Sequence, residues 1–387
     1  MKKILYVTSQ NPWNNNYGGA IRNNHIIKAL GKYHDLHVGL TSTNKIERES
    51  FLKFAPISKK NLHLLMEESS CTHTRKIQII INYVSTLLGF ENINRSFFTT
   101  LRNIKPDLVW YFQKFSIRSV GFPDRIPSIL DLDNVNWNLL KRTAKFQSGI
   151  SKYQTYLKMS LSYIEENMLI RKASFTTISN PEERNKLPDT TKVITINNGF
   201  TFPKNLVINQ KRNQRILFFG SLFYYPNLDG LKWFCGKVWP IIISRLPDSK
   251  LDIIGHVIEL GKIDNVLKLG NIKYHGFVED IDYFIKSNAF LIVPLRIASG
   301  TRIKILESWA KGLPVVSTSL GAEGLDATNH QTILIGDTPE EFAEACLRLL
   351  NDQHLGIQLA RNAYQTNKVK FNWDTIFQKI YNVTEDF

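Results

Sequence analysis

The stretch FLIVPLRIASGTRIKILESWAKGLPVVS, residues 290–317, has the strand–helix–strand pattern of a parallel α/β fold. An apolar run, Phe290–Val293, is followed by apolar residues at helical spacing and then by a second apolar run, Pro314–Ser317. Short continuous apolar runs are typical of strands that are buried on both faces of a parallel sheet. The stretch therefore predicts a β-α-β unit, in which Gly312-Leu-Pro314 ends the helix.

The same alternation of apolar runs and amphipathic stretches continues along the whole chain. Two amphipathic stretches, Ser179–Glu183 and Asp337–Glu341, begin with an N-cap residue, an early proline and acidic residues, as helices do. We therefore predict an α/β protein with two doubly wound, Rossmann-like domains that face a central cleft. The expected strands are Ile4–Val7, Leu36–Leu40, Leu108–Phe112, Ser128–Leu132, Phe175–Ile178 and Val193–Ile196 in the first half, and Ile216–Phe219, Lys250–Ile254, Ile272–His275, Phe290–Val293, Pro314–Ser317 and Thr332–Ile335 in the second.

The domain boundary is expected where the strand pattern restarts, near residue 215, after a polar stretch without periodicity. We expect an N-terminal domain over residues 1–200, a linker over residues 201–214 and a C-terminal domain over residues 215–365. The tail, residues 366–387, carries large apolar residues at helical spacing. We expect it to form a last helix that packs back toward the N-terminal domain.

Composition excludes several classes of protein. With 387 residues, of which 43% are apolar and 21% charged, the chain is typical of a globular protein and not of a disordered or fibrous one. We find no apolar run long enough for a transmembrane helix or a signal peptide, and the three cysteines are far apart in the sequence. We therefore expect a cytoplasmic protein without disulfides and without a structural zinc site.

Positive charge is concentrated in the first half of the chain. Residues 1–200 have 28 basic and 15 acidic side chains, a net charge of +13, whereas residues 201–387 have 21 and 19, a net charge of +2. The asymmetry predicts an anionic partner such as a membrane surface, a phosphorylated acceptor or nucleic acid, or else a basic surface that serves solubility. We find no nucleic-acid-binding motif and expect no nucleic-acid partner. The segment Lys76–Phe90 could be an interfacial helix or a core helix.

The loop and helix after Val293 combine groups that suit a diphosphate. We expect Ser299-Gly300-Thr301 to cap the helix, so that N–H groups of its first turn and the side chains of Arg302 and Lys304 form an anion-binding cradle. Glu307 follows further along the helix and is placed to accept hydrogen bonds from ribose hydroxyls. The alternative is that Arg302 and Glu307 are surface charges of an amphipathic helix.

Two places in the first half carry weaker signals. Gly18-Gly19 opens a helix after the first expected strand, where it could bring backbone N–H groups close to a phosphate or sugar, or could form a tight turn. Asp131-Leu-Asp133 ends a buried strand, where ligands of parallel sheets bind. This D-x-D spacing could hold a divalent metal on a nucleoside diphosphate, or one aspartate could cap the following helix.

The chain resembles the retaining GT-B glycosyltransferases of family 4 over most of its length. The resemblance implies a GT-B fold and an enzyme that uses a nucleotide sugar. The segments that carry it are Gly18-Gly19, Asp131–Val135, Ser179–Glu182 and Asn197–Gly199 in the first half, and Ile216–Leu222, Tyr274–Asp280, residues 294–314, Gly321–Leu325 and Gly336–Ala343 in the second.

The resemblance also implies roles for individual residues. Glu307 matches the second glutamate of the family's E-x7-E signature, which binds the ribose, and Asp133 stands where many members have a histidine that contacts the donor sugar. Gly276, Phe277 and Val278 match the segment around the nucleobase. The residues expected to bind the donor are Gly19, Gly276, Phe277, Val278, Ser299, Gly300, Thr301, Arg302, Lys304 and Glu307.

The chain departs from the family pattern in positions that carry charge. Ser299 replaces the first signature glutamate. The family's usual arginine and lysine are also missing, and Ser221 and either Pro226 or Asn227 stand at their positions. We expect Arg302 and Lys304 to supply the missing positive charge from the helix.

These residues predict a retaining glycosyltransferase that moves a sugar from a nucleoside diphosphate donor to a hydroxyl of a glycan or lipid-linked acceptor, in the synthesis of cell-surface polysaccharide or lipopolysaccharide. The expected catalytic residues are Asp133, Arg302 and Lys304, and we expect no metal or other cofactor, because cations of the chain can stabilise the leaving diphosphate. The basic first half would hold the enzyme at the cytoplasmic face of the membrane as a peripheral protein. The alternatives are a sugar-nucleotide epimerase of the same fold, a metal-dependent transferase that uses Asp131 and Asp133, a nucleic-acid-binding protein, and a catalytically silent sugar-nucleotide-binding relative.

Overall fold

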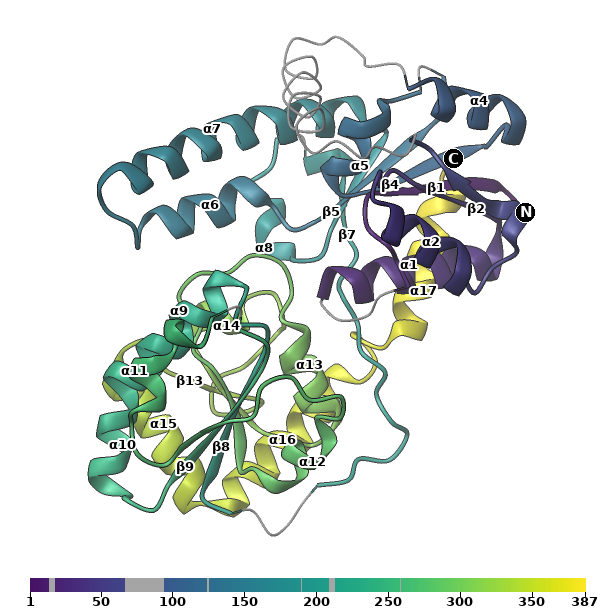
Figure 1. Ribbon diagram of the computed structural model, residues 1–387. Helices are drawn as coiled ribbons and strands as arrows, with labels where there is room; N and C mark the ends of the chain where they lie inside the picture. The colour runs from purple at the N-terminus through teal and green to yellow at the C-terminus, as the bar shows by residue number, and fades with distance from the viewer. Residues whose placement is uncertain (14–17, 67–93, 124, 189, 209–212, 258) are drawn as a thin grey trace. The chain divides into compact units, whose positions relative to one another are not determined.

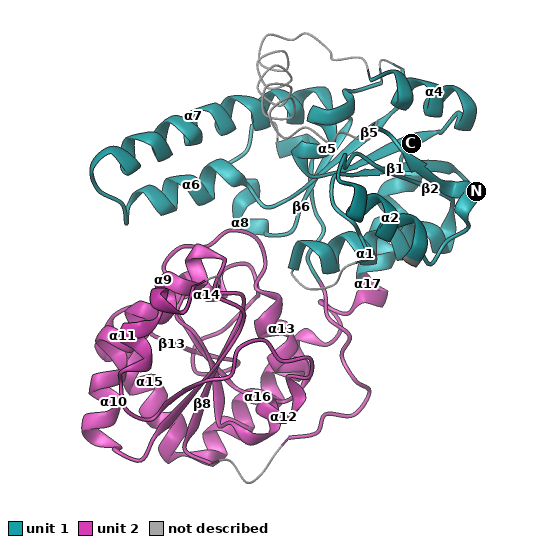
Figure 2. Ribbon diagram, viewed as in Figure 1, with its two compact units in different colours: residues 1–198, 376–387 teal, residues 199–375 magenta. Residues whose placement is uncertain are grey.

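The apolar runs of the sequence form two separate parallel β-sheets in the computed structural model (Figure 1). Unit 1 consists of Met1–Asn198 together with Ile376–Phe387, and unit 2 consists of Gly199–Thr375 (Figure 2). Helices cover both faces of each sheet, so each unit is doubly wound. The structure describes every residue except 14–17, 67–93, 124, 189, 209–212 and 258.

The described part of unit 1 has one sheet of seven parallel strands. These are β1 (Lys3–Thr8), β2 (Asp35–Leu40), β3 (Leu62–Leu64), β4 (Leu108–Phe112), β5 (Ser128–Asp133), β6 (Phe175–Ile178) and β7 (Val193–Thr195). Their order in the sheet is β3-β2-β1-β4-β5-β6-β7. Ile4 of β1 pairs with Leu36 of β2 on one side and with Leu108 of β4 on the other. The carboxyl ends of β1, β4 and β5 therefore meet at one edge of the sheet.

The helices of unit 1 pack on both faces of this sheet. They are α1 (Gly18–Tyr33), α2 (Lys45–Phe54), α4 (Arg95–Ile104), α5 (Gln113–Val120), α6 (Asn136–Ala144), α7 (Gly149–Lys172), α8 (Pro181–Arg184) and α17 (Trp373–Glu385), with 3-10 turns at Lys59–Asn61 and Thr190–Lys192. Leu101 of α4, Ile117 of α5 and Leu169 of α7 share one apolar core with Val109 of β4. Helices α1 and α17 lie on the opposite face (Figure 1).

The described part of unit 2 has a second sheet of six parallel strands. These are β8 (Arg215–Phe219), β9 (Lys250–Ile254), β10 (Ile272–Tyr274), β11 (Phe290–Val293), β12 (Val315–Ser317) and β13 (Leu334–Ile335). Their order is β10-β9-β8-β11-β12-β13, so β8 and β11 are neighbours at the centre. This order brings the loops that follow β8, β9 and β11 together at the carboxyl edge of the sheet.

The helices of unit 2 enclose two apolar cores, one on each face of the sheet. They are α9 (Tyr225–Trp233), a π-helical turn (Phe234–Val238), α10 (Trp239–Arg245), α11 (Asp264–Leu267), α12 (Asp282–Ser287), α13 (Ile303–Ala310), α14 (Ser319–Ala322), α15 (Pro339–Asn351) and α16 (Gln353–Asn367), with a 3-10 turn at Leu260–Lys262. Phe218 of β8 packs with Leu231 of α9 and Phe342 of α15. The neighbouring Leu217 faces the other way and packs with Trp309 of α13.

The last helix, α17, is held on unit 1 through its C-terminal part. The ring of Tyr381 lies 4.7 Å from that of Tyr33 in α1, and His34 Nε2 forms a hydrogen bond of 2.8 Å with Thr384 Oγ1. Lys2 Nζ donates to the Thr384 carbonyl at 2.7 Å. These contacts explain why Ile376–Phe387 belongs to unit 1 although the preceding residues belong to unit 2.

Residues 201–208, which lie in the segment expected to be a linker, pack on unit 2. Phe202 is buried in its core, and Leu206 packs against the same core. The hydroxyl of Tyr364 in α16 donates to the Lys204 carbonyl at 3.2 Å. The segment is therefore attached to unit 2 by single apolar residues, which do not form a pattern in its otherwise polar sequence.

The twelve strands expected from the sequence are confirmed to within two residues at each end. Strand β3 was not expected, because three residues at the edge of a sheet give no apolar run. The two helix-start signals are also confirmed: Asn180 caps α8 through a hydrogen bond of 3.0 Å from the Glu182 N–H, and Thr338 forms a capping box with Glu341.

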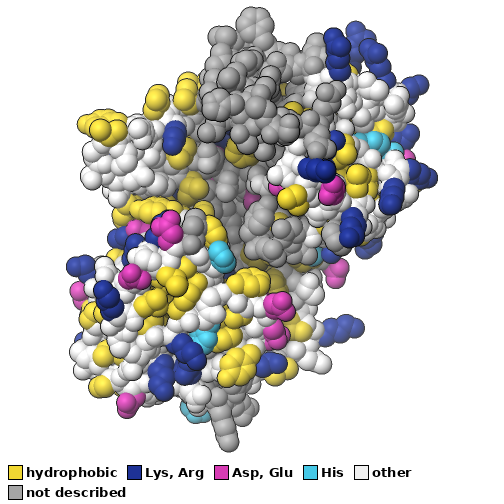
Figure 3. All heavy atoms as spheres, viewed as in Figure 1, with side chains coloured by type: hydrophobic (Ala, Val, Ile, Leu, Met, Phe, Trp, Pro, Cys, Tyr) yellow, Lys and Arg dark blue, Asp and Glu magenta, His cyan; other side chains and the backbone are white. Residues whose placement is uncertain are grey.

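Several sequence expectations concern surface and membrane properties. Segment Lys76–Phe90 and Cys71 lie outside the described residues. In the part of the chain that the structure describes, no helix has both the length and the apolar character to cross a bilayer. Figure 3 shows Lys and Arg side chains gathered on the part of unit 1 that carries α2, α4 and β2, as the charge asymmetry of the sequence suggests.

Candidate functional site

The amino group of Lys304 lies at the carboxyl edge of the unit 2 sheet. Lys304 is the second residue of α13, and Asn227 lies in the first turn of α9, so they follow the neighbouring strands β11 and β8. Lys304 Nζ donates to Asn227 Oδ1 at 3.0 Å and lies 5.4 Å from the centre of the Phe218 ring. The Asn227 amide in turn donates to the Ser221 carbonyl at 2.8 Å. These contacts fix a cation beside the turn that follows β8.

Two glycines make room for this cation. Gly220 has a φ of +149°, and a Cβ there would lie 2.6 Å from Lys304 Nζ and 2.9 Å from Asn227 Nδ2. Gly255, directly after β9, has a φ of +148°, and a Cβ there would lie 2.0 Å from the Gly220 carbonyl oxygen. The absence of side chains at both positions therefore allows the two turns to approach each other and the lysine to reach between them.

The ionisation of Lys304 is sensitive to its surroundings. Burial lowers the pKa of the Lys304 ammonium to about 7, and the nearby charge of Arg302 adds to this effect. The hydrogen-bond partner of the ammonium, Asn227, is neutral. An anionic ligand would favour the charged form of the lysine and would be bound more tightly in return. The arrangement is therefore suited to an anion such as a phosphate.

Replacing Gly220 with alanine is expected to weaken anion binding at Lys304 by about tenfold. The new Cβ would displace the ends of two flexible side chains, Lys304 and Asn227, and alanine is also strained at a φ of +149°, so the denaturation midpoint of the variant is measured beside the titration. Calorimetric titration with inorganic pyrophosphate measures the effect. Gly149→Ala is the matched control, because its φ of +59° also strains an alanine, whereas a Cβ there meets nothing within 4 Å. Unchanged pyrophosphate affinity in Gly220→Ala would show that the anion binds elsewhere.

The side chain of Arg302 is buried in unit 2 and forms hydrogen bonds there. It is 6% exposed, and its two terminal nitrogens donate to the backbone carbonyls of Gly300 and Leu320. One of them also lies 3.7 Å from the Glu323 carboxylate. These contacts tie the loop before α13 to the segment after β12. Arg302 therefore positions the loop, and the alternative that it is a surface charge is wrong.

The structure corrects the expected start of the helix that follows. Helix α13 begins at Ile303, and Arg302 is its N-cap residue without a side-chain cap hydrogen bond. The expectation that Ser299-Gly300-Thr301 caps this helix is therefore wrong. Gly300 has a φ of +72°, so the backbone turns there in a conformation that a right-handed helix does not contain. The helix ends as expected, with Gly312 in the left-handed region at φ +71° just after its C-cap.

Glu307 lies in the second turn of α13 and is held by a lysine. Lys311 Nζ lies 2.8 Å from the Glu307 carboxylate and 2.6 Å from that of Asp282. Although burial opposes it, the hydrogen bonds to these two carboxylates raise the pKa of Lys311. The Glu307 side chain is 20% exposed, so its carboxylate is oriented and still accessible to a ligand.

The segment Gly276–Val278 follows β10 at the same edge of the sheet. Gly276 has a φ of +70°, and its carbonyl accepts a hydrogen bond of 2.8 Å from the Gly255 N–H. Phe277 is 64% exposed, whereas Val278 packs against the core that also contains α13. The segment therefore presents one aromatic ring to solvent from a backbone that is anchored to the neighbouring strand.

In unit 1, a buried charge cluster joins α1 to the end of β5. The guanidinium of Arg22, which is 0% exposed, donates to both carboxylate oxygens of Asp131 at 2.9 Å. It also donates to the Ile196 carbonyl at 2.7 Å and to Asn198 Oδ1 at 2.8 Å. Although burial opposes it, the charges of Asp131 and Asp133 raise the pKa of Arg22. No role for Arg22 is apparent in the sequence, where its partner Asp131 is 109 residues away.

Asp133 ends β5 in the left-handed region, with a φ of +57°. Its carboxylate accepts a hydrogen bond of 3.2 Å from Asn198 and lies 3.8 Å from Arg22 Nε. Burial raises the pKa of the Asp133 carboxyl, although Arg22 opposes the shift. The N-cap residue of the following helix, α6, is Val135, whose N–H donates to the Glu183 carboxylate at 3.2 Å. The alternative that Asp131 or Asp133 caps this helix is therefore wrong.

Two further expectations concern Gly19 and a metal ion. Gly19 lies in the first turn of α1 and is partly buried. Within the described residues, no three or more His, Cys, Asp or Glu side chains come together in a group that could hold a metal. The Asp131 carboxylate is paired with Arg22, so the D-x-D spacing does not provide a donor set that fits a divalent cation.

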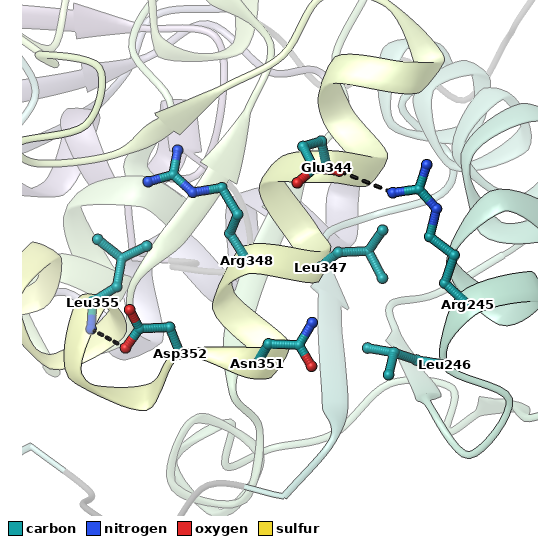
Figure 4. A pocket seen from close by; sticks show the side chains of 8 residues that line it. All are labelled: Arg245, Leu246, Glu344, Leu347, Arg348, Asn351, Asp352 and Leu355. Carbon is teal, nitrogen blue, oxygen red and sulfur yellow. Dashed lines mark hydrogen bonds and ion pairs between the residues drawn. The ribbon is translucent and has the colours of Figure 1, made fainter.

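A cavity of about 410 Å³ opens among α10, α15 and α16 of unit 2 (Figure 4). Arg245 and Leu246 line it just before β9 begins, so it lies toward the amino ends of the strands. Arg245 pairs with Glu344 across it at 3.0 Å. The cavity shares no lining residue with the surroundings of Lys304 and is separate from them.

Part of the chain is similar in sequence to glycosyltransferases. Residues 213–352 match the family model described as "Glycosyl transferases group 1". The "uncharacterized 44.6 kDa protein in cps region" of Klebsiella pneumoniae is 28% identical over 178 residues, which are 44% of this chain and 45% of that protein. The lipopolysaccharide core biosynthesis glycosyltransferase LpsE of Rhizobium meliloti is 32% identical over 145 residues, which are 35% of this chain and 41% of LpsE. Each match spans less than half of the relative's length.

The whole chain is similar in structure to HepE of Anabaena, whose crystal structure contains UDP and glucose. The TM-score is 0.65 and the identity 15%, and the match covers 100% of both chains. Similarity at this level of identity shows the fold. The chain has the GT-B fold, with two parallel-sheet, Rossmann-like units, and this part of the sequence prediction is confirmed.

Proposed function

We propose that this protein transfers a sugar from a nucleoside diphosphate sugar to a hydroxyl of a glycan or lipid-linked acceptor, in the assembly of a cell-surface polysaccharide or lipopolysaccharide. The family match over residues 213–352, the GT-B fold and the names of the relatives support this proposal. The observation that carries it is the Lys304 ammonium, held by Asn227 at the carboxyl edge of unit 2. As in the family that the sequence resembles, we propose retention of the anomeric configuration.

Lys304 is the cation that we assign to the donor diphosphate. It lies where ligands of doubly wound sheets bind, and α9 and α13 both begin beside it, so the positive ends of two helix dipoles add to its field. Its partner Asn227 is neutral, whereas the nitrogens of Arg302 are bonded to Gly300 and Leu320. We therefore propose that Lys304 binds the diphosphate and that Arg302 positions the loop that contacts it.

The proposed reaction needs one bond to break and one to form at the anomeric carbon. The bond from this carbon to the diphosphate oxygen breaks, and the acceptor hydroxyl oxygen bonds to the carbon from the same face. The hydroxyl proton passes to an oxygen of the leaving phosphate, so no side chain is needed as the base. Lys304 stabilises the negative charge that develops on the diphosphate. Because a fixed cation does this, we propose that the reaction needs no metal ion.

Further donor contacts are proposed on both units. Glu307 would accept hydrogen bonds from the ribose, since Lys311 holds its carboxylate in place, and Phe277 would contact the nucleobase with its exposed ring. In unit 1, Asp133 and Gly19 are the proposed contacts to the donor sugar. The other residues proposed for the donor site are Gly276, Val278, Ser299, Gly300 and Thr301.

We propose that the enzyme works at the cytoplasmic face of a membrane as a peripheral protein. Residues 1–200 carry a net charge of +13, which favours a surface of anionic lipid. A lipid-linked acceptor would be reached at the same surface.

The proposed function is tested by titrating the full chain calorimetrically with nucleoside diphosphates and their sugars, with and without a chelator. We expect one nucleoside diphosphate and its sugars to bind, unaffected by the chelator. Transfer to an added acceptor, followed by the configuration of the product, then tests the reaction. Release of an epimer without an acceptor would identify an epimerase. If no nucleotide binds, the proposal is wrong.

We expect the affinity for the selected nucleoside diphosphate to fall as the pH rises from about 7 to about 9. The pKa of Lys304 is lowered to about 7, so above this value binding must protonate the amine, and each pH unit weakens it by up to about tenfold. The terminal phosphate loses its last proton near about pH 6, so the charge of the ligand is constant over this range. Calorimetry in buffers of different ionisation enthalpy measures the proton uptake. An affinity independent of pH would contradict the assignment of Lys304.

A further inference from the structure

The outward face of α7 is apolar over much of its length. Ile150 is 77% exposed, Tyr153 76%, Leu157 63% and Ile164 48%. At about 100° per residue, these four side chains lie within an arc of about 60° on one side of the helix. A helix on the surface of a globular protein ordinarily has the opposite pattern, with its polar residues turned to solvent.

From Thr155 to Glu166 the buried residues of α7 are polar and have partners inside unit 1, and apolar burial begins only at Leu169. Thr155 Oγ1 donates to Gln147 Oε1 at 2.6 Å. Glu166, which is buried, accepts a hydrogen bond of 2.7 Å from Lys114 Nζ in α5. The helix therefore cannot rotate to bury its apolar residues without breaking a buried ion pair, and the apolar face is fixed toward solvent.

The same part of the chain carries only positive charge. Residues 134–164, which include α6 and most of α7, contain no Asp or Glu. Figure 3 shows hydrophobic and basic side chains side by side on the α6–α7 hairpin, which extends from the sheet of unit 1 in Figure 1. The five basic residues of this segment are Lys141, Arg142, Lys145, Lys152 and Lys158.

We propose that the α6–α7 hairpin docks on the surface of a bilayer that contains anionic lipid. The apolar stripe of Ile150, Tyr153, Leu157 and Ile164 would enter the boundary between head groups and acyl chains, while the lysines contact lipid phosphates. Tyrosine suits this depth because its ring is apolar and its hydroxyl polar. Phe146, which is 41% exposed in the turn between the helices, extends the apolar surface to the end of the hairpin.

Charge favours a bilayer over a second copy of the chain as the occupant of this surface. A symmetric dimer through the hairpin would bring two segments of net charge +5 together, and they would repel each other. An anionic bilayer instead attracts the lysines and accepts the apolar stripe. The inference names the surface for the membrane contact proposed above, and it depends on that contact but not on the transfer reaction.

The test is flotation of the full chain with vesicles of phosphatidylcholine alone and of phosphatidylcholine mixed with phosphatidylglycerol. We expect binding to the mixed vesicles, and at least about tenfold weaker binding by the double variant Ile150→Ser and Leu157→Ser. The matched control is Ile46→Ser with Val369→Ser, whose side chains are 77% and 65% exposed outside the hairpin. The control should bind within about twofold of the wild type.

A second pair of variants tests whether vesicle binding depends on where the positive charge lies or only on the net charge of the protein. Lys141, Lys145 and Lys158 changed to Gln should weaken binding much more than Lys232, Lys237 and Lys262 changed to Gln, although both sets remove three exposed positive charges. Equal loss in the two sets, or no binding of the wild type to mixed vesicles, would overturn the proposal. So would a wild-type dimer that the Ile150 and Leu157 variant converts to a monomer. Nucleotide titration of the same variants reports on the proposed function separately.

Discussion

Replacing Arg22 with methionine should lower the free energy of unfolding of unit 1 by about 3–5 kcal/mol. Arg22 is 0% exposed and donates to both oxygens of Asp131 at 2.9 Å. The variant would leave the carboxylates of Asp131 and Asp133 buried at the end of β5 after losing this cation. Hydrogen exchange of the full chain measures the effect, because it reports the amides of β1 and β5 separately from those of β8 and β11.

Two further variants show whether Arg22→Met is unstable because carboxylates are left buried without their cation or because side-chain packing is lost. Arg22→Met combined with Asp131→Leu should recover much of the stability, because apolar residues often replace a buried ion pair without loss. Arg296→Met removes a similar two-nitrogen pair with Asp229, but the Arg296 side chain is 31% exposed, so we expect a loss below about 1 kcal/mol. If Arg22→Met behaves like Arg296→Met, the buried cluster does not stabilise unit 1 as argued.

The strands could be predicted because their signal is local. In β4, all five residues Leu108–Phe112 are buried, since helices cover both faces of the sheet, and the sequence reads as one apolar run. Strand β3 lies at an edge and only its first residue, Leu62, is buried, so its three residues resemble a loop. A strand can be recognised from the sequence when both of its faces are buried, because it then forms a continuous apolar run.

The candidate site could be predicted only in part, because its contacts join distant residues. Lys304 stands out beside a helix start, but its partner Asn227 is 77 residues away, and only the resemblance to a family connects the two positions. Arg302 has the same charge two residues earlier, yet its side chain turns inward to the Gly300 and Leu320 carbonyls. Residue type shows which charges are available, whereas the backbone around Gly300 decides which of them faces the carboxyl edge.

Replacing Lys304 with methionine is expected to reduce kcat/KM for the nucleotide sugar by about 10²–10³-fold, because it removes the charge assigned to the leaving diphosphate. The measurement is a steady-state transfer assay with the donor that titration selects. Lys311→Met is not a suitable control, since Lys311 holds Glu307. Lys232→Met is better matched, because Lys232 is exposed on α9, the helix that also carries Asn227. It should retain activity within about twofold.

The free energy of unfolding of Lys304→Met shows whether its loss of activity comes from misfolding. We expect the activity to fall while the free energy of unfolding stays the same or rises. The Lys304 ammonium loses hydration on folding, as its pKa of about 7 indicates, and methionine has a similar length without that penalty. Lys304→Met should therefore unfold at the same or a higher denaturant concentration than the wild type while its activity falls. Lys304 would then lower the stability of the unliganded protein and raise its affinity for the anion, as functional residues often do. Transfer activity within about threefold of the wild type would contradict this role, and a large loss of stability would show that Lys304 is a structural residue of unit 2 instead.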